Sequence, residues 1–295
     1  MREHSPHLQG PTKAGFSLLQ SVGPKRSSNL RPFTKFRLLA HLLPGHLVEF
    51  WDRVAAFIAV RWDRKRSKRP HYKPSDWVRS ADMLQDVLRA DISAVLRETI
   101  LLETERKVLD QLTKIRIVGP FSMSHNADFD LGRCCYACCR AYKPLVVVET
   151  GVAYGVTTRF VLEALAANGE GELWSIDLPP LGFESDAQVG ALVPAELRQR
   201  WHLYRGPSKR LLPQVLALLP RVDIFIHDSL HTYANMKSEF RAVWPVLRPG
   251  GILITDDIGK NTAFQDFAQE ARPRFYAVFR EQSKDSLFGI LVKES

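Results

Sequence analysis

From residue 145 to the end of the chain, short apolar runs alternate with longer segments whose apolar residues recur at helical spacing. Short runs bounded by glycines and acids predict strands, and strands that alternate with helices predict a parallel sheet with helices on both faces. The last two runs, separated by QSKD, predict an antiparallel hairpin at the sheet edge. The pattern therefore predicts an α/β fold with a doubly wound, Rossmann-like sheet of seven strands, at 145–150, 171–177, 201–206, 222–228, 251–257, 274–281 and 286–294.

The chain ahead of this region has a different character. Its first part is basic and rich in Ser, Pro and Gly, which predicts a segment that is partly disordered and partly helical. Residues 76–113 have helical periodicity without glycine or proline, with Ser75 or Ser80 as the candidate cap. We therefore divide the chain into an N-terminal segment at 1–75, a helical appendage at 76–118 and a main domain at 119–295.

The net charge of +9 is unevenly distributed. Residues 1–80 hold 16 Lys and Arg against 5 Asp and Glu, whereas residues 81–295 hold 25 against 27. A nucleic-acid-binding fold would carry a basic stripe on the domain itself. The nearly neutral main domain therefore argues against nucleic acid as a partner.

Residues 36–70 combine an apolar stretch with the basic run RWDRKRSKRP. The apolar part is too short and too often interrupted by charge to span a bilayer. An amphipathic segment beside a polybasic run can lie on an anionic membrane surface as a peripheral contact. The alternative is a helix that docks on the main domain or on the second copy in a homodimer.

All four cysteines lie in the hexapeptide CCYACC, at residues 134–139. On a helix they would share one broad face and pack there as small hydrophobic side chains. Metal binding or redox chemistry is the alternative. No disulfide framework or secretory signal is evident, which favours a reducing cytoplasm, with attachment to a membrane surface as the variant.

The first predicted strand ends in the sequence ETGVAYG, residues 149–155. A glycine turn between a strand and a helix lets a ligand approach the backbone closely. It lacks the third glycine of the dinucleotide fingerprint, and Glu149 would oppose a pyrophosphate, so a nicotinamide-dependent oxidoreductase is disfavoured. A carboxylate there suits a ligand with an amino group or a sulfonium. Asp177, which ends the second strand, is placed to accept hydrogen bonds from ribose hydroxyls.

These features resemble the class I S-adenosylmethionine-dependent methyltransferases, over residues 120–294. ETGVAYG resembles the first motif of that family, SIDLP contains its ribose-binding acid, and RPGGILITDD resembles the strand that closes its site. The resemblance implies S-adenosylmethionine as the cofactor. It implies that the cofactor is bound by Glu149, Gly151, Ala153, Tyr154, Gly155, Asp177, Gly206, Pro207 and Ser208.

Three acids stand at the ends of the fourth and fifth strands. Asp228 ends the fourth strand, and Asp256 and Asp257 end the fifth. Neighbouring strand ends face one crevice, where these carboxylates would repel one another unless a cation neutralised them. We predict that they bind Mg²⁺ or a similar divalent cation. The alternative is that they cap turns or bond loop amides.

The segment HDSLHTY resembles the pattern H-D-x-x-H-x-Y of bacterial sugar-type O-methyltransferases and their cephalosporin-hydroxylase-like relatives. In the metal-dependent catechol-type O-methyltransferases a catalytic lysine stands where this chain has His231. An imidazole titrates near neutral pH and suits removal of a proton from a hydroxyl. We predict His231 as the catalytic base beside Asp228, and we expect His227 to pack or to orient Asp228. Tyr233 would be structural or line the substrate.

The sequence thus predicts a Mg²⁺-assisted O-methyltransferase that acts on a hydroxyl of a small molecule, a sugar or a secondary metabolite. A metal-dependent hydrolase or a hydroxylase-associated subunit of the same fold is a second interpretation. A third is a non-enzymatic binding module that its basic N-terminus anchors.

Overall fold

A computed structural model of the chain describes residues 47–66, 68–115, 121, 129–181, 185–281 and 286–294. The expectations for residues 1–46, and for most of the loop 119–128, lie outside the described residues.

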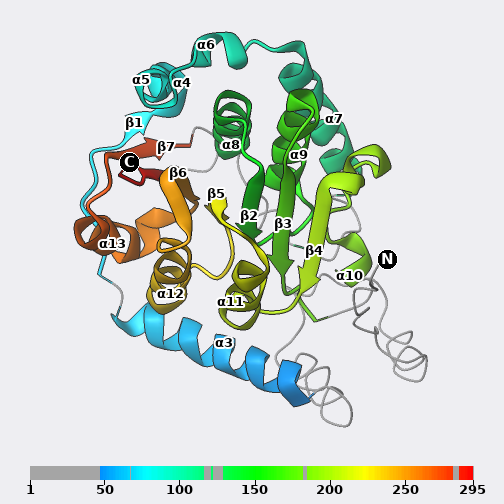
Figure 1. Cartoon of the computed structure of the whole chain (residues 1–295). Coiled ribbons are helices and arrows are strands. Elements are labelled where there is room, and N and C mark those ends of the chain that lie inside the picture. The colour runs from blue at the N-terminus through cyan, green and yellow to red at the C-terminus, as the bar shows by residue number, and fades with distance from the viewer. Residues whose placement is uncertain are drawn as a thin grey trace.

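One eight-stranded sheet forms the centre of the molecule (Figure 1). Its strand order is β1-β7-β8-β6-β5-β2-β3-β4, and all neighbouring strands are parallel except where β8 pairs with β6 and β7. All seven predicted strands are present, and a two-residue strand, β1, is added beside β7. The strands are β1 Ser75–Asp76, β2 Val146–Thr150, β3 Glu172–Asp177, β4 Trp201–Arg205, β5 Val222–His227, β6 Leu247–Thr255, β7 Phe275–Arg280 and β8 Leu287–Val292.

Helices cover both faces of this sheet, α8 and α9 on one face and α11, α12 and α13 on the other (Figure 1). In the described part of the chain, no helix combines the length and apolarity needed to cross a membrane. The α-helices and 3-10 helices (η) are α3 Leu47–Arg66, α4 Trp77–Ser80, η2 Ala81–Leu84, α5 Gln85–Leu88, α6 Ile92–Val95, α7 Thr99–Ile115, α8 Phe129–Tyr142, α9 Val156–Asn168, α10 Ser185–Gln188, η4 Ala195–Arg200, α11 Ser208–Leu218, α12 Tyr233–Val243, η5 Ile258–Lys260 and α13 Ala263–Ala271.

The continuous apolar strands feed two separate cores, because successive side chains point to opposite faces of a sheet. Val147 and Ile224 join the core under α8 and α9, whereas Val148 and Phe225 join the core under α11 to α13. Burial on both faces explains why these strands read as unbroken apolar runs. Several polar side chains gather where these strands end, and the candidate site forms there.

The helical periodicity of residues 76–113 resolves into a series of short helices before the long helix α7. Arg89 adopts a left-handed backbone with φ of 52° and ends α5. The Asp91 carboxylate then accepts a hydrogen bond from the Ala94 N–H (2.9 Å) and starts α6. An aspartate that caps a new helix interrupts the preceding one, although the apolar spacing continues across the break.

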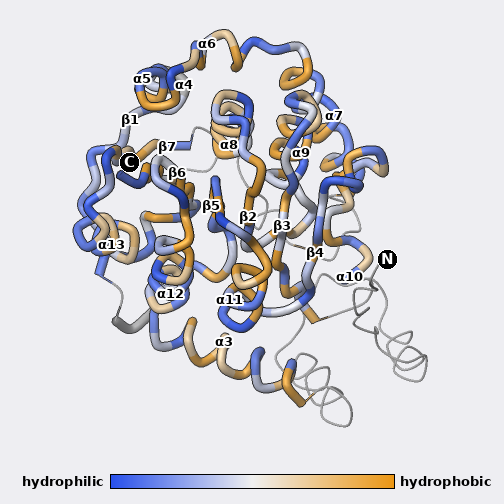
Figure 2. The backbone as a smooth tube through the Cα atoms, viewed as in Figure 1, coloured by the Kyte–Doolittle hydropathy of each residue, from blue (hydrophilic) through white to orange (hydrophobic). Residues whose placement is uncertain are grey.

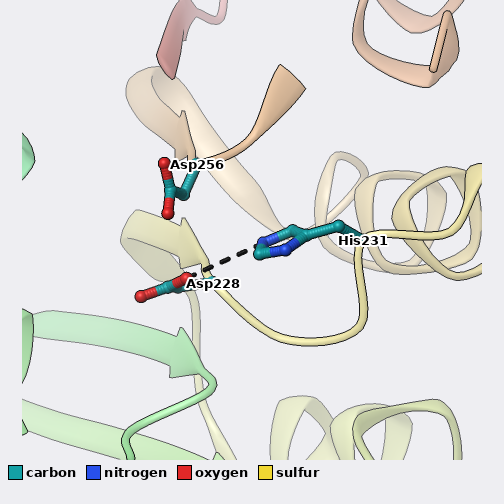
Figure 3. A group of neighbouring side chains, drawn as sticks. All are labelled: Asp228, His231 and Asp256. Atoms are coloured by element: carbon teal, nitrogen blue, oxygen red, sulfur yellow. Dashed lines mark ion pairs between the residues drawn. The ribbon is translucent and has the colours of Figure 1, made fainter. Parts of the chain in front are cut away.

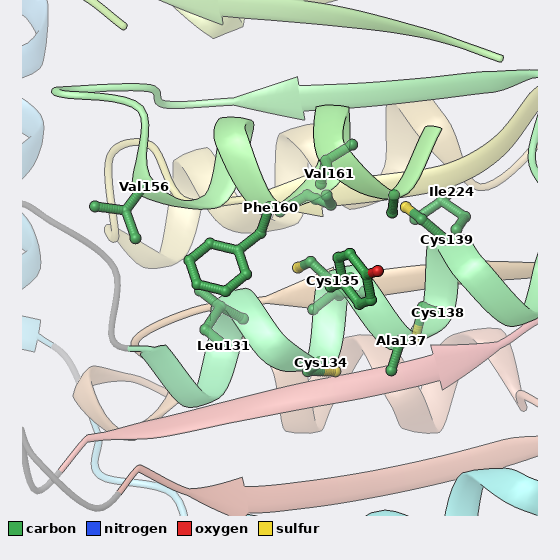
Figure 4. Packing of buried hydrophobic residues seen from close by; sticks show 14 of the residues in the cluster. Leu131, Cys134, Cys135, Ala137, Cys138, Cys139, Val156, Phe160, Val161 and Ile224 are labelled. Carbon is green, nitrogen blue, oxygen red and sulfur yellow. The ribbon is translucent and has the colours of Figure 1, made fainter. Parts of the chain in front are cut away.

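The cysteine run lies on α8, deep in the core shared with α9 (Figure 4). All four cysteines are free and fully buried. Burial raises the pKa of the Cys134, Cys135 and Cys139 thiols well above the usual value. Phe160 of α9 and Leu131 pack in the same cluster. The packing interpretation therefore holds for CCYACC, and the one metal-competent group found among the described residues lies elsewhere.

We expect the four thiols to be unreactive in the folded protein, because all four are fully buried and reagents cannot reach them. Titration with a chromogenic disulfide reagent should give no fast reaction in buffer and full reaction of all four cysteines in denaturant. Rapid reaction of a pair of cysteines under native conditions would contradict this packing.

Candidate active site at the carboxyl edge of the sheet

The residues that follow β2, β5 and β6 stand in one row at the carboxyl edge of the sheet. The Asp228 N–H donates to the last carbonyl of β2 (2.7 Å) and the Asp256 N–H to the last carbonyl of β5 (2.9 Å). The Gly151 N–H donates to a carbonyl of β3 (2.9 Å), and Asp177 pairs in register with Arg205 of β4. The ladder of hydrogen bonds thus continues past the strand ends and fixes the order of these five residues.

This row crosses the point where the direction of winding reverses. From β2 the chain proceeds outward through β3 and β4 on one side, and β5 and β6 lie on the other side. Ligands of doubly wound sheets bind in the crevice outside such a switch point. The predicted cofactor turn and the predicted acids therefore lie at one edge of the sheet.

The glycine turn is shaped by two close backbone approaches. Gly151 has φ of 88°, and a Cβ on it would lie 2.0 Å from the carbonyl oxygen of Asp228. Gly155 has φ of 87°, and a Cβ there would lie 2.9 Å from the Cα of Gly190. Both positions require glycine, because no side chain fits either the backbone conformation or the space.

Two other residues that we predicted to bind the cofactor could meet a ligand only through their main chains. Ala153 has φ of 50°, and its carbonyl accepts a hydrogen bond from the Gly190 N–H (2.9 Å). The Tyr154 side chain points into the core, where its hydroxyl accepts a hydrogen bond from the Phe121 N–H (3.1 Å). Tyr154 thus anchors the turn, and only its main chain could face a ligand.

Asp177 is the acid best placed to meet a ligand at this edge. One carboxylate oxygen accepts hydrogen bonds from the backbone N–H groups of Val152 (3.1 Å) and Ala153. The other oxygen is buried without a hydrogen-bond partner among the described residues. Burial raises the pKa of Asp177 to about 6, although the two amides act in the opposite direction. An unsatisfied buried oxygen of this kind fits a hydroxyl donor such as those of a ribose.

Glu149 lies beneath the turn and is fully buried. One of its carboxylate oxygens accepts hydrogen bonds from the hydroxyls of Thr158 (2.9 Å) and Ser175 (2.7 Å). Burial raises the pKa of Glu149 to about 7 despite these two hydrogen bonds. These contacts tie β2 to α9 and β3, so they support the turn from below.

Gly206, Pro207 and Ser208 connect β4 to α11 at the same edge. The Gly206 N–H donates to the Asp177 carbonyl (2.8 Å), which holds this loop beside the end of β3. The Ser208 hydroxyl bonds the Glu239 carboxylate, so that side chain is directed into the protein.

Asp228, His231 and Asp256 form the one group of metal-competent side chains found among the described residues (Figure 3). One ligand atom from each lies within 4.8 Å of the others. The Asp256 side chain is buried, and the other two are only partly exposed. His231 Nε2 lies 3.7 Å from an Asp228 oxygen, too far for a hydrogen bond, and has no hydrogen-bond partner among the described residues.

Asp257, the third predicted metal ligand, lies outside this group. Its backbone is left-handed, with φ of 54°, which turns the carboxylate away from its neighbour Asp256. The carboxylate accepts hydrogen bonds from His231 Nδ1 (3.1 Å) and the Ser286 hydroxyl (2.7 Å) and forms an ion pair with Lys260. Burial alone would raise the pKa of Asp257, but these partners lower it well below its usual range. The adjacent acids therefore differ in role, and Asp257 holds the imidazole.

His227 is fully buried. Its Nδ1 contacts the Glu239 carboxylate at 2.6 Å, and its ring meets that of His231 edge to face at 5.2 Å. We expected His227 to pack or to orient Asp228, and its polar partner in the structure is Glu239 instead. Tyr233 begins α12, and its hydroxyl donates to Asp266 (3.0 Å).

Glu239 is the residue that sequence reasoning missed. It lies on α12 between Met236 and Phe240, which are both buried, although a surface acid is the ordinary expectation for a helix. An acid that falls within the apolar face of a helix is the available signal, because a buried carboxylate must be paired.

We expect Gly151→Ala to disrupt this edge, because the new methyl group would overlap the Asp228 carbonyl. Chemical denaturation should show a loss of roughly 3 kcal/mol or more in the free energy of unfolding. Gly169→Ala is the matched control, since Gly169 also has positive φ (77°) but nothing within 4 Å of the added atom. The control should lose only about 1 kcal/mol, from backbone strain alone. Equal losses would show that the contact with Asp228 is unimportant.

Comparison with known proteins agrees with this geometry. Residues 148–258 match the family model of a methyltransferase domain. Among solved structures, a proposed O-methyltransferase from Klebsiella pneumoniae has 16% identity and a TM-score of 0.50, covering 74% of this chain and 97% of its own. Cofactor-bound Rv0187 from MTB has 14% identity and a TM-score of 0.50, covering 76% and 100%. The O-methyltransferase from Bacillus cereus, in complex with S-adenosylhomocysteine, has 14% identity and a TM-score of 0.49, covering 74% and 98%.

No curated protein matches the chain in sequence. At such low identity the solved structures establish the fold, and the matching segment contains the glycine turn, Asp177, Asp228, His231 and both acids at the end of β6. Residues 148–258 are therefore similar to a methyltransferase domain, and the chain shares the fold of these solved structures.

Proposed function

We propose that this protein transfers a methyl group from S-adenosylmethionine to a hydroxyl of a small molecule, with Mg²⁺ or a similar cation assisting. The observation that carries the proposal is the meeting of Asp228, His231 and Asp256 in the same row as the glycine turn. A base and a pair of carboxylates beside a methyl-donor site suit an acceptor that must lose a proton before it reacts.

The cofactor would lie across the turn at Gly151 and over the end of β3. The unsatisfied Asp177 oxygen supports this placement, because it can accept a hydrogen bond from a ribose hydroxyl. The tight approach of Gly151 to Asp228 also brings the two halves of the site to adjacent positions.

Asp228 and Asp256 would hold the cation, since hard divalent ions prefer carboxylate oxygens. Such a cation, when bound, makes an acceptor hydroxyl more acidic. His231 Nε2 has a single lone pair, which can serve a cation or a proton but not both. We assign it to the proton, because the two carboxylates already supply oxygen ligands.

The surroundings of His231 suit a base. An ionised carboxylate only accepts hydrogen bonds, so contact with Asp257 requires the hydrogen of the neutral ring to sit on Nδ1. The lone pair then lies on Nε2, which has no hydrogen-bond partner among the described residues. Asp257 would also stabilise the imidazolium that forms after proton transfer.

In the reaction, Nε2 of His231 takes the hydroxyl proton, and the acceptor oxygen forms a bond to the methyl carbon. The bond between that carbon and sulfur breaks, and its electron pair stays on sulfur. The products are a methyl ether and neutral S-adenosylhomocysteine. The Klebsiella pneumoniae protein is itself described as a proposed O-methyltransferase, and we propose a sugar or a secondary metabolite as the acceptor here.

We expect the protein to bind S-adenosylhomocysteine with micromolar affinity, measured by calorimetry. Mg²⁺ should bind in the same experiment, and Asp228→Asn together with Asp256→Asn should abolish the Mg²⁺ signal because the ligand charge is lost. Cofactor affinity should change little in this variant. A folded protein that binds no S-adenosylhomocysteine would refute the methyl-transfer proposal, and unchanged Mg²⁺ binding would refute the cation site alone.

We expect His231→Ala to lower turnover by on the order of a hundredfold or more, with cofactor affinity retained. Transfer of a labelled methyl group to a panel of catechols and sugars measures this. His202→Ala is the control, because His202 stacks on Trp174 and bonds Glu172 away from the row of strand ends. Unchanged turnover in His231→Ala would eliminate that residue as the base, and activity without the methyl donor would favour a hydrolase.

A further inference from the structure

Helix α3 lies across the end of the molecule at which β3 and β4 finish (Figure 1). Its inner side is polar and is held by charge. Glu49 forms an ion pair with Arg205 at the end of β4 (2.8 Å), and Asp52 pairs with Arg210 of α11 (3.0 Å). The Arg53 guanidinium donates to a backbone carbonyl just after β3 (2.8 Å).

The far end of α3 is attached in the same way. Asp63 accepts a hydrogen bond from the Tyr233 N–H at the start of α12 (2.8 Å). Burial alone would raise the pKa of Glu49, but Arg205 and Arg53 lower it to about 2, so Glu49 stays ionised at neutral pH. The helix is thus docked along its length through polar contacts.

The outer side of α3 is apolar and faces solvent. In Figure 2 hydrophobic residues recur along this helix even though it forms the outer boundary of the molecule. At about 100° per residue, the outward positions fall within one stripe of roughly 100°. They are Leu47 at 57% exposed, Val48 at 61%, Trp51 at 62%, Ile58 at 48% and Trp62 at 58%.

This polarity is the reverse of that of an ordinary surface helix, which buries its apolar stripe against the core. Phe57, 69% exposed, flanks the same stripe. Isolated exposed apolar residues need no explanation, but a continuous stripe with two tryptophans marks an interaction surface. Tryptophan is the side chain that favours the boundary between water and lipid headgroups.

The chain that leaves this stripe is strongly basic. Within residues 61–73 the one acid is Asp63, whose carboxylate is engaged with α12. The described side chains of Arg61, Lys68, Arg69 and Lys73 are exposed. The basic residues of this segment are Arg61, Arg64, Lys65, Arg66, Lys68, Arg69 and Lys73.

We propose that the outer stripe of α3 lies on an anionic lipid surface, with the exposed side chains of Arg61, Lys68, Arg69 and Lys73 bound to the lipid headgroups. An interfacial helix combines an apolar face with neighbouring positive charge in this way, and neither feature alone gives firm attachment. Because polar contacts already hold the inner face, the helix binds the lipid without leaving the domain. The proposal depends on α3 and the basic residues that follow it, and is independent of the methyl-transfer chemistry.

A second copy of the chain is the competing occupant of this stripe. Self-association through α3 would bring two basic segments to one interface and leave their charge without a counterpart. An anionic bilayer neutralises that charge, and charge complementarity therefore favours lipid.

The test is cosedimentation of the full chain with vesicles at about 0.15 M salt. The protein should pellet with vesicles of phosphatidylcholine and phosphatidylserine at roughly two to one, and should stay in solution with phosphatidylcholine alone. Replacing two outward residues, Trp51→Gln with Ile58→Gln, should weaken vesicle binding by about tenfold or more. Reversing two charges, Lys68→Glu with Arg69→Glu, should weaken it by a similar factor.

The matched control removes two exposed leucines from α7, Leu102→Gln with Leu109→Gln. These side chains are 54% and 57% exposed, comparable to the α3 pair, and should leave vesicle binding unchanged. Circular dichroism and thermal unfolding confirm that each variant folds. Failure to pellet with anionic vesicles, or equal weakening by the α7 pair, would overturn the proposal. A dimer in light scattering that the α3 pair converts to monomer, without any vesicle binding, would assign the stripe to self-association.

Discussion

The arrangement of the candidate site depends on one buried carboxylate, that of Glu239. It accepts hydrogen bonds from the Thr150 hydroxyl at the end of β2 (2.6 Å), from Ser229 after β5 (2.7 Å) and from Asn235 of α12 (2.8 Å), and it contacts His227 Nδ1 at 2.6 Å. A buried charge is tolerated only when such donors satisfy it. Burial would raise the pKa of Glu239, yet His227 and the other donors lower it to about 2, so the charge persists at neutral pH. The ends of two central strands and the loop that carries Asp228 and His231 are thereby fixed to one point.

Much of the fold could be predicted because burial on both faces leaves a clear imprint on a parallel sheet. The central apolar runs are strands because their residues alternate between two cores, as Val147 and Val148 do. The strand-end acids could be assigned to one edge because parallel strands finish together. Asp177, Asp228 and Asp256 accordingly lie in one row. Adjacency in this row follows from strand order, which the resemblance to a known family supplied.

What could not be predicted depends on backbone conformation and tertiary placement. Asp256 and Asp257 are identical neighbours in sequence, and only the left-handed backbone at Asp257 sends their carboxylates to different partners. In the sequence Glu239 looks like an ordinary surface acid of a helix. Only the folded structure brings the ends of β2 and β5 to it. The amphipathic pattern of α3 was evident, but the direction in which each side faces was not. Ion pairs such as that of Glu49 with Arg205 determine that direction, and they join residues far apart in sequence.

The contact between Gly151 and the carbonyl of Asp228 has a consequence for how such a protein can diversify. The contact lies between the Gly151 backbone and the main-chain carbonyl of Asp228. A side-chain substitution therefore cannot adjust it in small steps. The spacing between the glycine turn and the loop that carries Asp228 is therefore fixed by the backbone. Sequence variation can then arise in surrounding segments such as α3, whose Arg53 contacts the backbone just after β3. If the centre stays fixed while the surrounding segments change, the proposed chemistry can be kept as the acceptor changes.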